Sequence, residues 1–311
     1  MYHFFVNPAS RSGSGAAIWD ETEKLLIARK VEYRLHYTEK GVSIKEQYED
    51  ILKTTPERPI KIVIIGGDGT LNQCVEGITD LENTEVSLIR NGSGNDFSRN
   101  KDLPDTIEDA LDAILAREHV MKIDVGLSTY TDGVYADNTP APDGHHRFLV
   151  STGIGYDADI CYNANSHVKL KKVLKSFIYT YFGIVNVFTT PRSDFEVNID
   201  GQLKMYPHVY FLSAMNQPYE GGGIGMVPDA DDTDGQLGFC LIYGLTRLGA
   251  LFTVPAMLKQ KHVGRKGVAI LKSSKVTVAS KVPKWVHYDG ETPGLYKNFT
   301  AEIIGKMNFI Y

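Results

Sequence analysis

The sequence has no apolar run of the ~18 or more residues that cross a bilayer, and no basic segment followed by an apolar one at its start. Met1 leads directly into the strand-like segment Tyr2–Val6. Cysteine is scarce, and Cys74, Cys161 and Cys240 form no CxxC pair. Isolated cysteines are typical of reduced intracellular proteins. These absences predict a cytoplasmic protein without a secretion signal or disulfides.

Several catalytic signatures are also missing. The chain has no GxxxxGK[ST] motif, which excludes a P-loop kinase, and neither a protein-kinase catalytic loop nor an HExxH motif. The composition, 42% apolar and 23% charged, is that of an ordinary globular protein, and 311 residues suit two domains.

Charge is unevenly distributed. Residues 1–125 carry 15 Lys/Arg and 22 Asp/Glu, whereas residues 126–311 carry 18 and 16. Residues 160–193 and 235–288 contain no acid at all. This asymmetry predicts that part of the second half faces an anionic partner, such as a membrane surface; a solvated basic face is the alternative. We expect no nucleic-acid partner, and a homodimer is left open.

The most informative stretch is Gly66–Thr70 (GGDGT), which follows the apolar run Ile60–Ile65. So few polar residues predict a strand buried on both faces of a parallel sheet. The glycines let the backbone turn sharply, and a helix beginning near Thr70 points free N–H groups at whatever binds there. The stretch predicts a phosphate-binding turn; an ordinary turn capped by Thr70 is the alternative.

Two further Gly-rich turns follow strand-like runs. Asn7–Gly15 comes after Phe4–Val6, and Arg90–Phe97 comes after Val86–Ile89. Because the carboxyl ends of parallel strands meet at one edge of a sheet, we expect the three turns to form one nucleotide site.

Secondary-structure patterns divide the chain near residue 125. Residues 1–125 alternate strands and helices, which predicts a doubly wound parallel sheet with helices on both faces; Thr106 has the pattern of an N-cap. Residues 126–311 hold many short strands separated by turns, which predicts a mainly-β sandwich with helices at Val168–Phe188 and Leu245–Lys261. The prediction leaves open that the C-terminal tail, near 300–311, packs back on the first domain.

The chain resembles the diacylglycerol kinase catalytic-domain family, within the superfamily of diacylglycerol, sphingosine and NAD kinases. The three turns match its early motifs, except that Arg90 replaces the usual Pro and Ser93 the usual Thr. For Arg90, a surface change and an added phosphate contact both stay open. The family's later motifs, which NAD kinases lack, are matched by Gly153–Ala158, Asn216–Gly223, Pro228–Leu237 and Asp289–Glu291.

The resemblance implies ATP as phosphoryl donor, Mg²⁺ as cofactor and a lipid as acceptor. Asp68 would organise the catalytic magnesium. The residues implied for ATP binding all lie in the three turns: Asn7, Ser10, Gly67, Gly69, Thr70, Gly92, Ser93, Asn95 and Asp96.

By the same resemblance Glu291 is the general base, with Asp289 beside it and Asp96 and Asp124 completing an acidic cluster. Asp68 would then face Glu291 across an interdomain cleft. Structural alternatives are an N-cap for Asp96, a hairpin turn for Asp289 and a supporting role for Asp124.

Two further segments, an acidic loop and a basic helix, are candidates for a metal site and a membrane contact. The family's structural magnesium makes Asp234 the expected ligand, with Asp232 beside it; a solvated acidic loop is the alternative. Leu170–Phe188 mixes lysines with aromatic and apolar residues, which suits an anionic bilayer surface, although a core helix explains the apolar positions better.

Together these features predict a cytoplasmic lipid kinase, peripheral to the membrane, that phosphorylates diacylglycerol or a related lipid. A sphingoid-base kinase is the nearest alternative. A nucleotide-binding regulatory protein without transfer activity is an alternative of another class.

Overall fold

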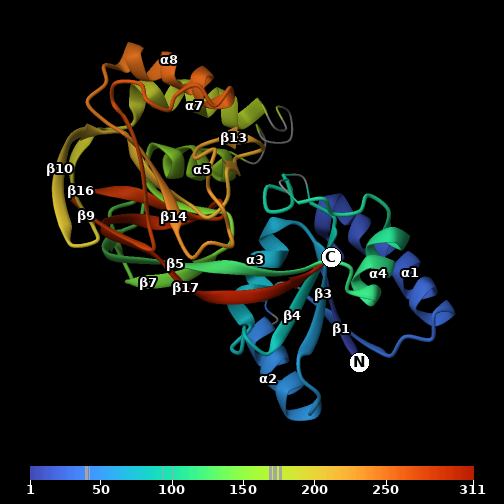
Figure 1. Cartoon of the computed structure of the whole chain (residues 1–311). Coiled ribbons are helices and arrows are strands. Elements are labelled where there is room, and N and C mark those ends of the chain that lie inside the picture. Colours follow the sequence, from blue (N-terminus) through green and yellow to red (C-terminus); the bar gives the residue numbers. More distant parts are fainter. Residues whose placement is uncertain are drawn as a thin grey trace. The chain divides into compact units, whose positions relative to one another are not determined.

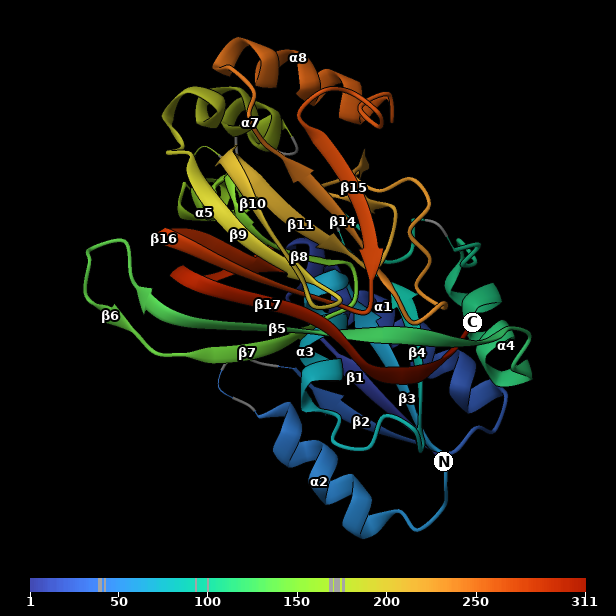
Figure 2. The ribbon, with the colours of Figure 1, turned by 60° about the vertical axis from the view of Figure 1, so that its left-hand side comes forward.

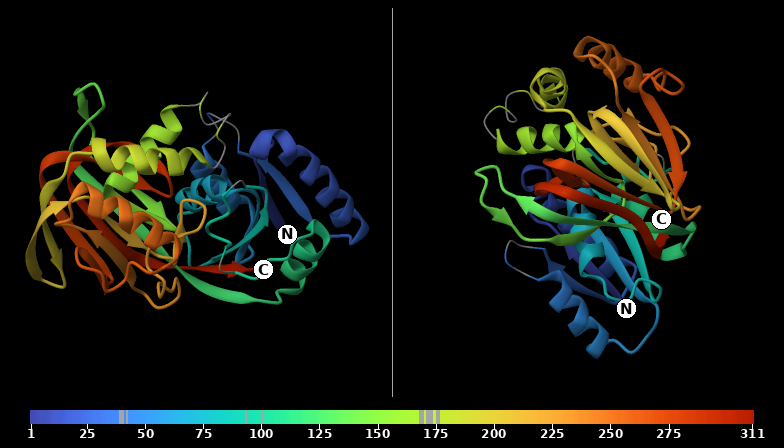
Figure 3. Two further views of the ribbon diagram at one scale, coloured as in Figure 1. Left: turned by 90° about the horizontal axis from the view of Figure 1, so that it is seen from above. Right: turned by 90° about the vertical axis from the view of Figure 1, so that its left-hand side faces the viewer.

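The computed structural model describes residues 1–38, 41, 43–92, 94–99, 101–167, 170, 174 and 177–311. Contacts divide the chain into two compact units: Met1–Val125 with Gly305–Tyr311, and Gly126–Ile304 (Figure 1). Both chain ends belong to the first unit (Figure 3). No helix of the described residues is long and apolar enough to cross a membrane.

The first unit is a parallel sheet in the order β4-β3-β1-β2. Strands and helices alternate along the chain, as in a doubly wound fold. Its elements are β1 (Tyr2–Val6), α1 (Ser10–Ala28), β2 (Tyr33–Tyr37), α2 (Ile44–Thr54), β3 (Ile60–Gly66), α3 (Asp68–Gly77), β4 (Thr84–Arg90) and α4 (Ile107–Ala116).

Helices cover the sheet because each presents an apolar side to it. Trp19 and Leu26 of α1 pack with Leu111 and Ile114 of α4 against Phe4 and its neighbours in β1, β3 and β4. The predicted N-cap of α4 is confirmed, since the Thr106 hydroxyl accepts a hydrogen bond from the Asp109 N–H at 3.0 Å.

The strand beside β4 differs from the sequence-based expectation. The pattern at residues 120–125 predicted a fifth strand that closes the parallel series. That segment begins β5 (Val120–Val134), which pairs with β17 (Glu291–Ile310). The end of β17 lies parallel to β4, with Asn308 opposite Glu85 and Phe309 opposite Val86. The tail supplies this neighbour because Phe309 and Ile310 are apolar enough to be buried.

The second unit is the predicted β-sandwich with helices (Figure 2). Its elements are β6 (Pro140–Ala141), β7 (Gly144–Phe148), β8 (Ser151–Gly155), α5 (Tyr156–Ser166), α7 (Phe177–Thr189), β9 (Ser193–Ile199), β10 (Gln202–Val209), β11 (Phe211–Met215), β12 (Tyr219–Glu220), β13 (Ile224–Gly225), β14 (Leu237–Ile242), α8 (Arg247–Leu258), β15 (Val268–Ser273) and β16 (Lys275–Tyr288), together with most of β5 and β17.

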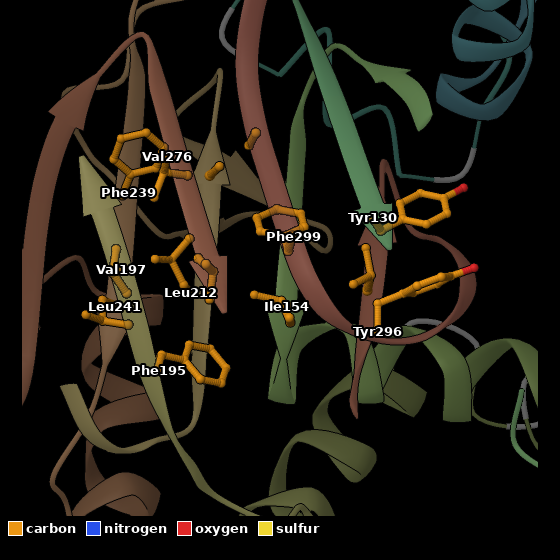
Figure 4. Close-up of a cluster of buried hydrophobic side chains, with 14 of the residues drawn as sticks. Tyr130, Ile154, Phe195, Val197, Leu212, Phe239, Leu241, Val276, Tyr296 and Phe299 are labelled. Atoms are coloured by element: carbon orange, nitrogen blue, oxygen red, sulfur yellow. The ribbon is translucent and has the colours of Figure 1, made fainter. Parts of the chain in front are cut away.

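Strand β16 belongs to both layers of the sandwich. Its residues 276–280 pair with β9, and its residues 286–288 pair with β8, on either side of a register shift between Ala279 and Lys284. Alternate side chains from both layers fill the core between them, including Phe195, Leu212, Phe239 and Phe299 (Figure 4).

Several elements of this unit were missed from the sequence, among them α5, β10 and β15. Helix α5 starts directly after β8 in a segment identified only as a family motif, and no strand was predicted at β10 or β15. Strand β10 is mostly exposed, so it lacks the apolar alternation that identifies a strand.

The first prediction concerns the buried carboxylate of Asp124, which is fully inaccessible and lies 2.6 Å from the ammonium of Lys306, near the start of the tail segment. This pairing supports the structural role for Asp124. We expect Lys306→Met to lower the free energy of unfolding by about 3 kcal/mol, because it leaves a buried charge without its cation. Urea denaturation measures the change. Lys306→Arg is the control and should retain most of the stability, whereas a Met variant as stable as wild type would contradict the assignment.

Candidate active site

The first turn is fixed by the side chain of Asn7. Its amide nitrogen donates to the Thr70 hydroxyl at 3.2 Å, and its oxygen accepts from the Ala9 N–H at 3.1 Å. Helix α1 begins at Ser10, so most of the segment expected to be a Gly-rich loop is helical. Gly15 lies against the loop so closely that a Cβ there would be 2.0 Å from the Asn7 carbonyl oxygen.

The second turn is tighter than the sequence suggested. Helix α3 begins at Asp68 with Gly67 as its N-cap, two residues before the expected start. Thr70 therefore lies within the first helical turn and is 5% exposed. The first N–H groups of a helix have no acceptor within the helix, and such helix ends favour anions.

The third turn is held against the other two. The Asn91 N–H donates to the Gly66 carbonyl at 2.7 Å, and its amide nitrogen donates to the Ser10 hydroxyl at 2.7 Å. Gly67 and Gly92 touch through their backbones, because a Cβ on Gly67 would be 2.7 Å from the Cα of Gly92. The three predicted turns are therefore together at one edge of the sheet.

Asp68 links the second turn to the third. Its carboxylate accepts hydrogen bonds from the N–H groups of Asp96 at 2.9 Å and Phe97 at 3.3 Å. Asp96 itself forms an ion pair with Arg99. The loop between them is thus fixed by the carboxylate that was expected to organise magnesium. Ser93 lies outside the described residues.

The turns enclose an open cavity of about 340 Å³. Its described lining includes most of the predicted ATP-binding residues but neither Asn95 nor Asp96. It also includes Arg11, Asn91 and Gly94 from the predicted first and third turns, and Gln73 of α3, which was not predicted; of these four, only Arg11 carries a positive charge. The lining residues are Asn7, Ser10, Arg11, Gly67, Asp68, Gly69, Thr70, Gln73, Asn91, Gly92 and Gly94.

Arg90 braces a neighbouring loop. Its guanidinium donates to the carbonyl oxygens of Leu103 and Pro104 and pairs with Asp105 at 2.7 Å. It is not among the described residues that line the cavity. Of the two interpretations left open, these contacts favour the one without a phosphate contact.

In the second unit, Asp289 fixes the backbone of its own turn. Its carboxylate accepts hydrogen bonds from the N–H groups of Leu149, Val150 and Ser151 at 2.9, 2.9 and 3.0 Å. Glu291, two residues later, is exposed at the start of β17. These contacts support a positioning role for Asp289. That Glu291 faces Asp68 remains a prediction.

The two expected metal ligands, Asp234 and Asp232, both contact protein groups. The Asp234 carboxylate pairs with the Lys272 ammonium at 2.5 Å and accepts the Gln236 N–H at 2.9 Å. Asp232 is 4% exposed and accepts a hydrogen bond from Gln217 at 2.9 Å. Lys272 therefore neutralises Asp234 in this structure, and a metal ion at Asp234 and Asp232 remains a prediction.

A buried polar cluster in the second unit was not predicted from the sequence, although two of its residues lie in the family motifs Gly153–Ala158 and Asn216–Gly223. Ligand atoms of Asp157, Glu220 and His287 lie within 4.8 Å of one another. The Asp157 carboxylate already accepts hydrogen bonds from Ser213 at 2.5 Å and from the Ala158 N–H at 2.8 Å, and His287 lies 3.2 Å from it. We therefore assign the cluster a structural role. Asp157 and Glu220 are 63 positions apart and Glu220 and His287 are 67 apart, so no local pattern indicates that the three lie together.

Comparison with known proteins identifies the family to which the three Gly-rich turns belong. Residues 1–128 match the family described as diacylglycerol kinase catalytic domain, and residues 150–303 match the YegS C-terminal NAD kinase beta sandwich-like domain. The chain belongs to the diacylglycerol kinase catalytic-domain family. This family is one of kinase-type phosphotransferases, as the sequence motifs implied.

Relatives within this kinase family are distant. A Bacillus subtilis protein provisionally named the lipid kinase YtlR is 24% identical over 303 residues, or 94% of each chain. A Staphylococcus haemolyticus diacylglycerol kinase is 26% identical over 237 residues, 75% of this chain and 65% of that one. The crystal structure of a provisionally named Bacillus anthracis diacylglycerol kinase superposes with a TM-score of 0.75 at 21% identity, covering 100% of this chain and 94% of that one, which establishes the shared fold.

The second prediction tests the contact between the Gly-rich turns of this kinase. Gly67→Ala places a methyl group 2.7 Å from the Cα of Gly92, so one turn must shift. We expect a loss of about 1–3 kcal/mol in the free energy of unfolding, measured by chemical denaturation. Gly69→Ala is the matched control, because its Cβ would meet nothing within 4 Å among the described atoms and should not destabilise the protein. Equal stabilities for the two variants would disprove the close contact.

The third prediction concerns the pH dependence of stability. Burial acts to lower the pKa of His287, but the hydrogen bond and charge of Asp157, with the charges of Glu220 and Asp289, raise it overall. A group whose pKa is raised on folding stabilises the fold below its unfolded pKa, about 6.5, and this gain is lost as the pH rises through the folded pKa.

We therefore expect His287→Gln to be more destabilising near pH ~6 than near pH ~8.5, by up to about 1.4 kcal/mol for each pH unit between the two pKa values. Denaturation curves across this range measure it. His145→Gln, at an exposed position, is the control. A pH-independent difference would rule out titration of His287.

Proposed function

We propose that this protein is an ATP-dependent lipid kinase that transfers the γ-phosphoryl group of ATP to a lipid hydroxyl, with diacylglycerol as the favoured acceptor. The observation that carries the proposal is the contact between three strand-end turns around one cavity of about 340 Å³. Membership of the diacylglycerol kinase catalytic-domain family supports the reaction class. The names of the relatives support the acceptor.

The chain's part in holding ATP is to donate hydrogen bonds to phosphate. The N–H groups at the start of α3, together with its dipole, favour an anion beside Gly69 and Thr70. Asn7 and Ser10 contribute polar side chains from the first turn, and Arg11 adds a cation to the same lining. A nucleotide's phosphates would therefore meet donors from the first and second turns.

The cavity contains a carboxylate that suits magnesium, an ion that prefers carboxylate and phosphate oxygens as ligands and retains several waters. Asp68 lines the cavity and presents hard oxygen ligands, while two backbone N–H groups fix its orientation. When bound, magnesium would neutralise charge that develops on the phosphate oxygens. Asp68 is the residue that would hold it.

Glu291 is the proposed general base. It would accept the proton of the lipid hydroxyl as that oxygen bonds to the γ-phosphorus, while the bond between the γ-phosphorus and the bridging oxygen breaks and its electron pair leaves with ADP. Asp289, hydrogen-bonded to three backbone N–H groups, would hold the turn that precedes Glu291. Asp289 is thus proposed as a positioning residue.

The fourth prediction tests the reaction. Wild-type protein, ATP and magnesium are incubated with diacylglycerol, with a sphingoid base and with NAD, and phosphorylated products are separated. We expect a phosphorylated diacylglycerol, and we expect Glu291→Gln to lower kcat by about 100-fold or more, because general-base catalysis contributes about 10²–10⁴-fold. Glu196→Gln, an exposed change in the same unit, is the control and should retain activity.

Each outcome decides a separate point. Phosphorylation of the sphingoid base alone would replace the acceptor but keep the enzyme class. ATP binding without phosphorylation of any lipid would favour a regulatory nucleotide-binding protein and overturn the proposal. Full activity of Glu291→Gln would remove the base assignment.

A further inference from the structure

Helices α7 and α8 lie side by side in the second unit (Figures 1 and 2) and are apolar on more than one face. The Arg247 guanidinium, at the start of α8, donates to the Val187 carbonyl of α7 at 2.7 Å. One side of each helix is core, because Val187, Ala250 and Met257 pack in the same buried cluster. The opposite sides of both helices point away from that core.

Those opposite sides are also apolar, although they are exposed to solvent. On α7, Tyr181, Ile184 and Phe188 follow helical spacing and are 48%, 50% and 46% exposed. On α8, Leu248, Phe252 and Leu258 are 63%, 71% and 56% exposed. We call these six side chains the α7–α8 face.

A helix that is apolar all round is normally buried on every side, and large contiguous apolar faces mark sites of interaction. Sequence reasoning favoured the core for the apolar positions of Leu170–Phe188, and this was correct only for one side of α7, including Ile178 and Phe182. The six side chains of the α7–α8 face therefore need another explanation.

Charge around the face identifies the kind of partner. The segment after α8 exposes Lys259, Lys261, Arg265 and Lys266. The sequence from residue 235 to 288 carries nine Lys/Arg and neither Asp nor Glu. Apolar and aromatic side chains bordered by cations are the combination that binds the interface of an anionic bilayer. Four other basic residues of the predicted membrane-facing segment lie outside the described residues: Lys169, Lys171, Lys172 and Lys175.

We propose that the α7–α8 face docks on the surface of an anionic membrane, with its apolar side chains in the headgroup region and the cations after α8 beside lipid phosphates. The docking would bring the chain to the bilayer that contains a lipid acceptor, and to that extent it rests on the proposed function. The face itself is defined by exposure and charge alone, so its test is independent of catalysis.

The test is sedimentation with vesicles of equal parts phosphatidylglycerol and phosphatidylcholine, and with vesicles of phosphatidylcholine alone. We expect wild-type protein to bind the anionic vesicles, less at high salt, and to bind the neutral ones weakly. Leu248→Glu with Phe252→Glu should weaken binding about tenfold or more, because charge enters the apolar face. The matched control is Leu203→Glu with Met205→Glu on β10, where the two side chains are 61% and 54% exposed and the added charge is the same.

Three results would overturn the proposal. The first is no binding of wild-type protein to anionic vesicles. The second is equal weakening by the α7–α8 and β10 substitutions. The third is a wild-type dimer that the α7–α8 substitutions alone convert to a monomer, without vesicle binding, which would make the face an interface between copies.

Circular dichroism establishes that each variant is folded. Vesicle binding without phosphorylation of any lipid would refute the proposed function and leave the docking surface standing. Phosphorylation of a dispersed short-chain diacylglycerol without vesicle binding would support the proposed function and refute the docking surface.

Discussion

The contact between the backbones of Gly67 and Gly92 is the constraint on which the candidate site depends. Neighbouring parallel strands bring β3 and β4 to the same sheet edge, but only the absence of two side chains lets their turns touch. Asn91 then reaches the Gly66 carbonyl and the Ser10 hydroxyl, which ties in the turn after β1. Three loops distant in sequence are thus held together around one cavity.

The acidic residues singled out in the sequence divide by what surrounds them. Asp68 and Asp289 accept hydrogen bonds from backbone N–H groups, and Asp124 is buried against Lys306. Contacts within the protein therefore hold each of these three carboxylates in place without a substrate. Glu291 differs, because it is exposed and the turn before it is fixed by Asp289. A general base must come within hydrogen-bond reach of the proton that it takes, and the exposed carboxylate of Glu291 is accessible to a ligand.

Much of the fold and part of the site were predictable because their signals are local. Apolar runs followed by glycines identified β3, β4 and their turns, and most of the predicted turn residues line one cavity. Gln73 was missed because its place in the lining depends on where α3 begins, and this helix starts earlier than expected. The pairing of Asp157 with His287 and the exposure of Phe252 depend on how distant segments pack, which no local pattern records.

The position of β17 has a consequence for the order in which the chain folds. The strand beside β4 comes from residues 305–311, whereas the rest of that sheet lies within the first 125 residues. During synthesis the ribosome makes the whole second unit before this strand emerges. The edge of β4 therefore stays without its β17 partner until the second unit has been synthesised. The first unit begins folding first, yet it is completed last.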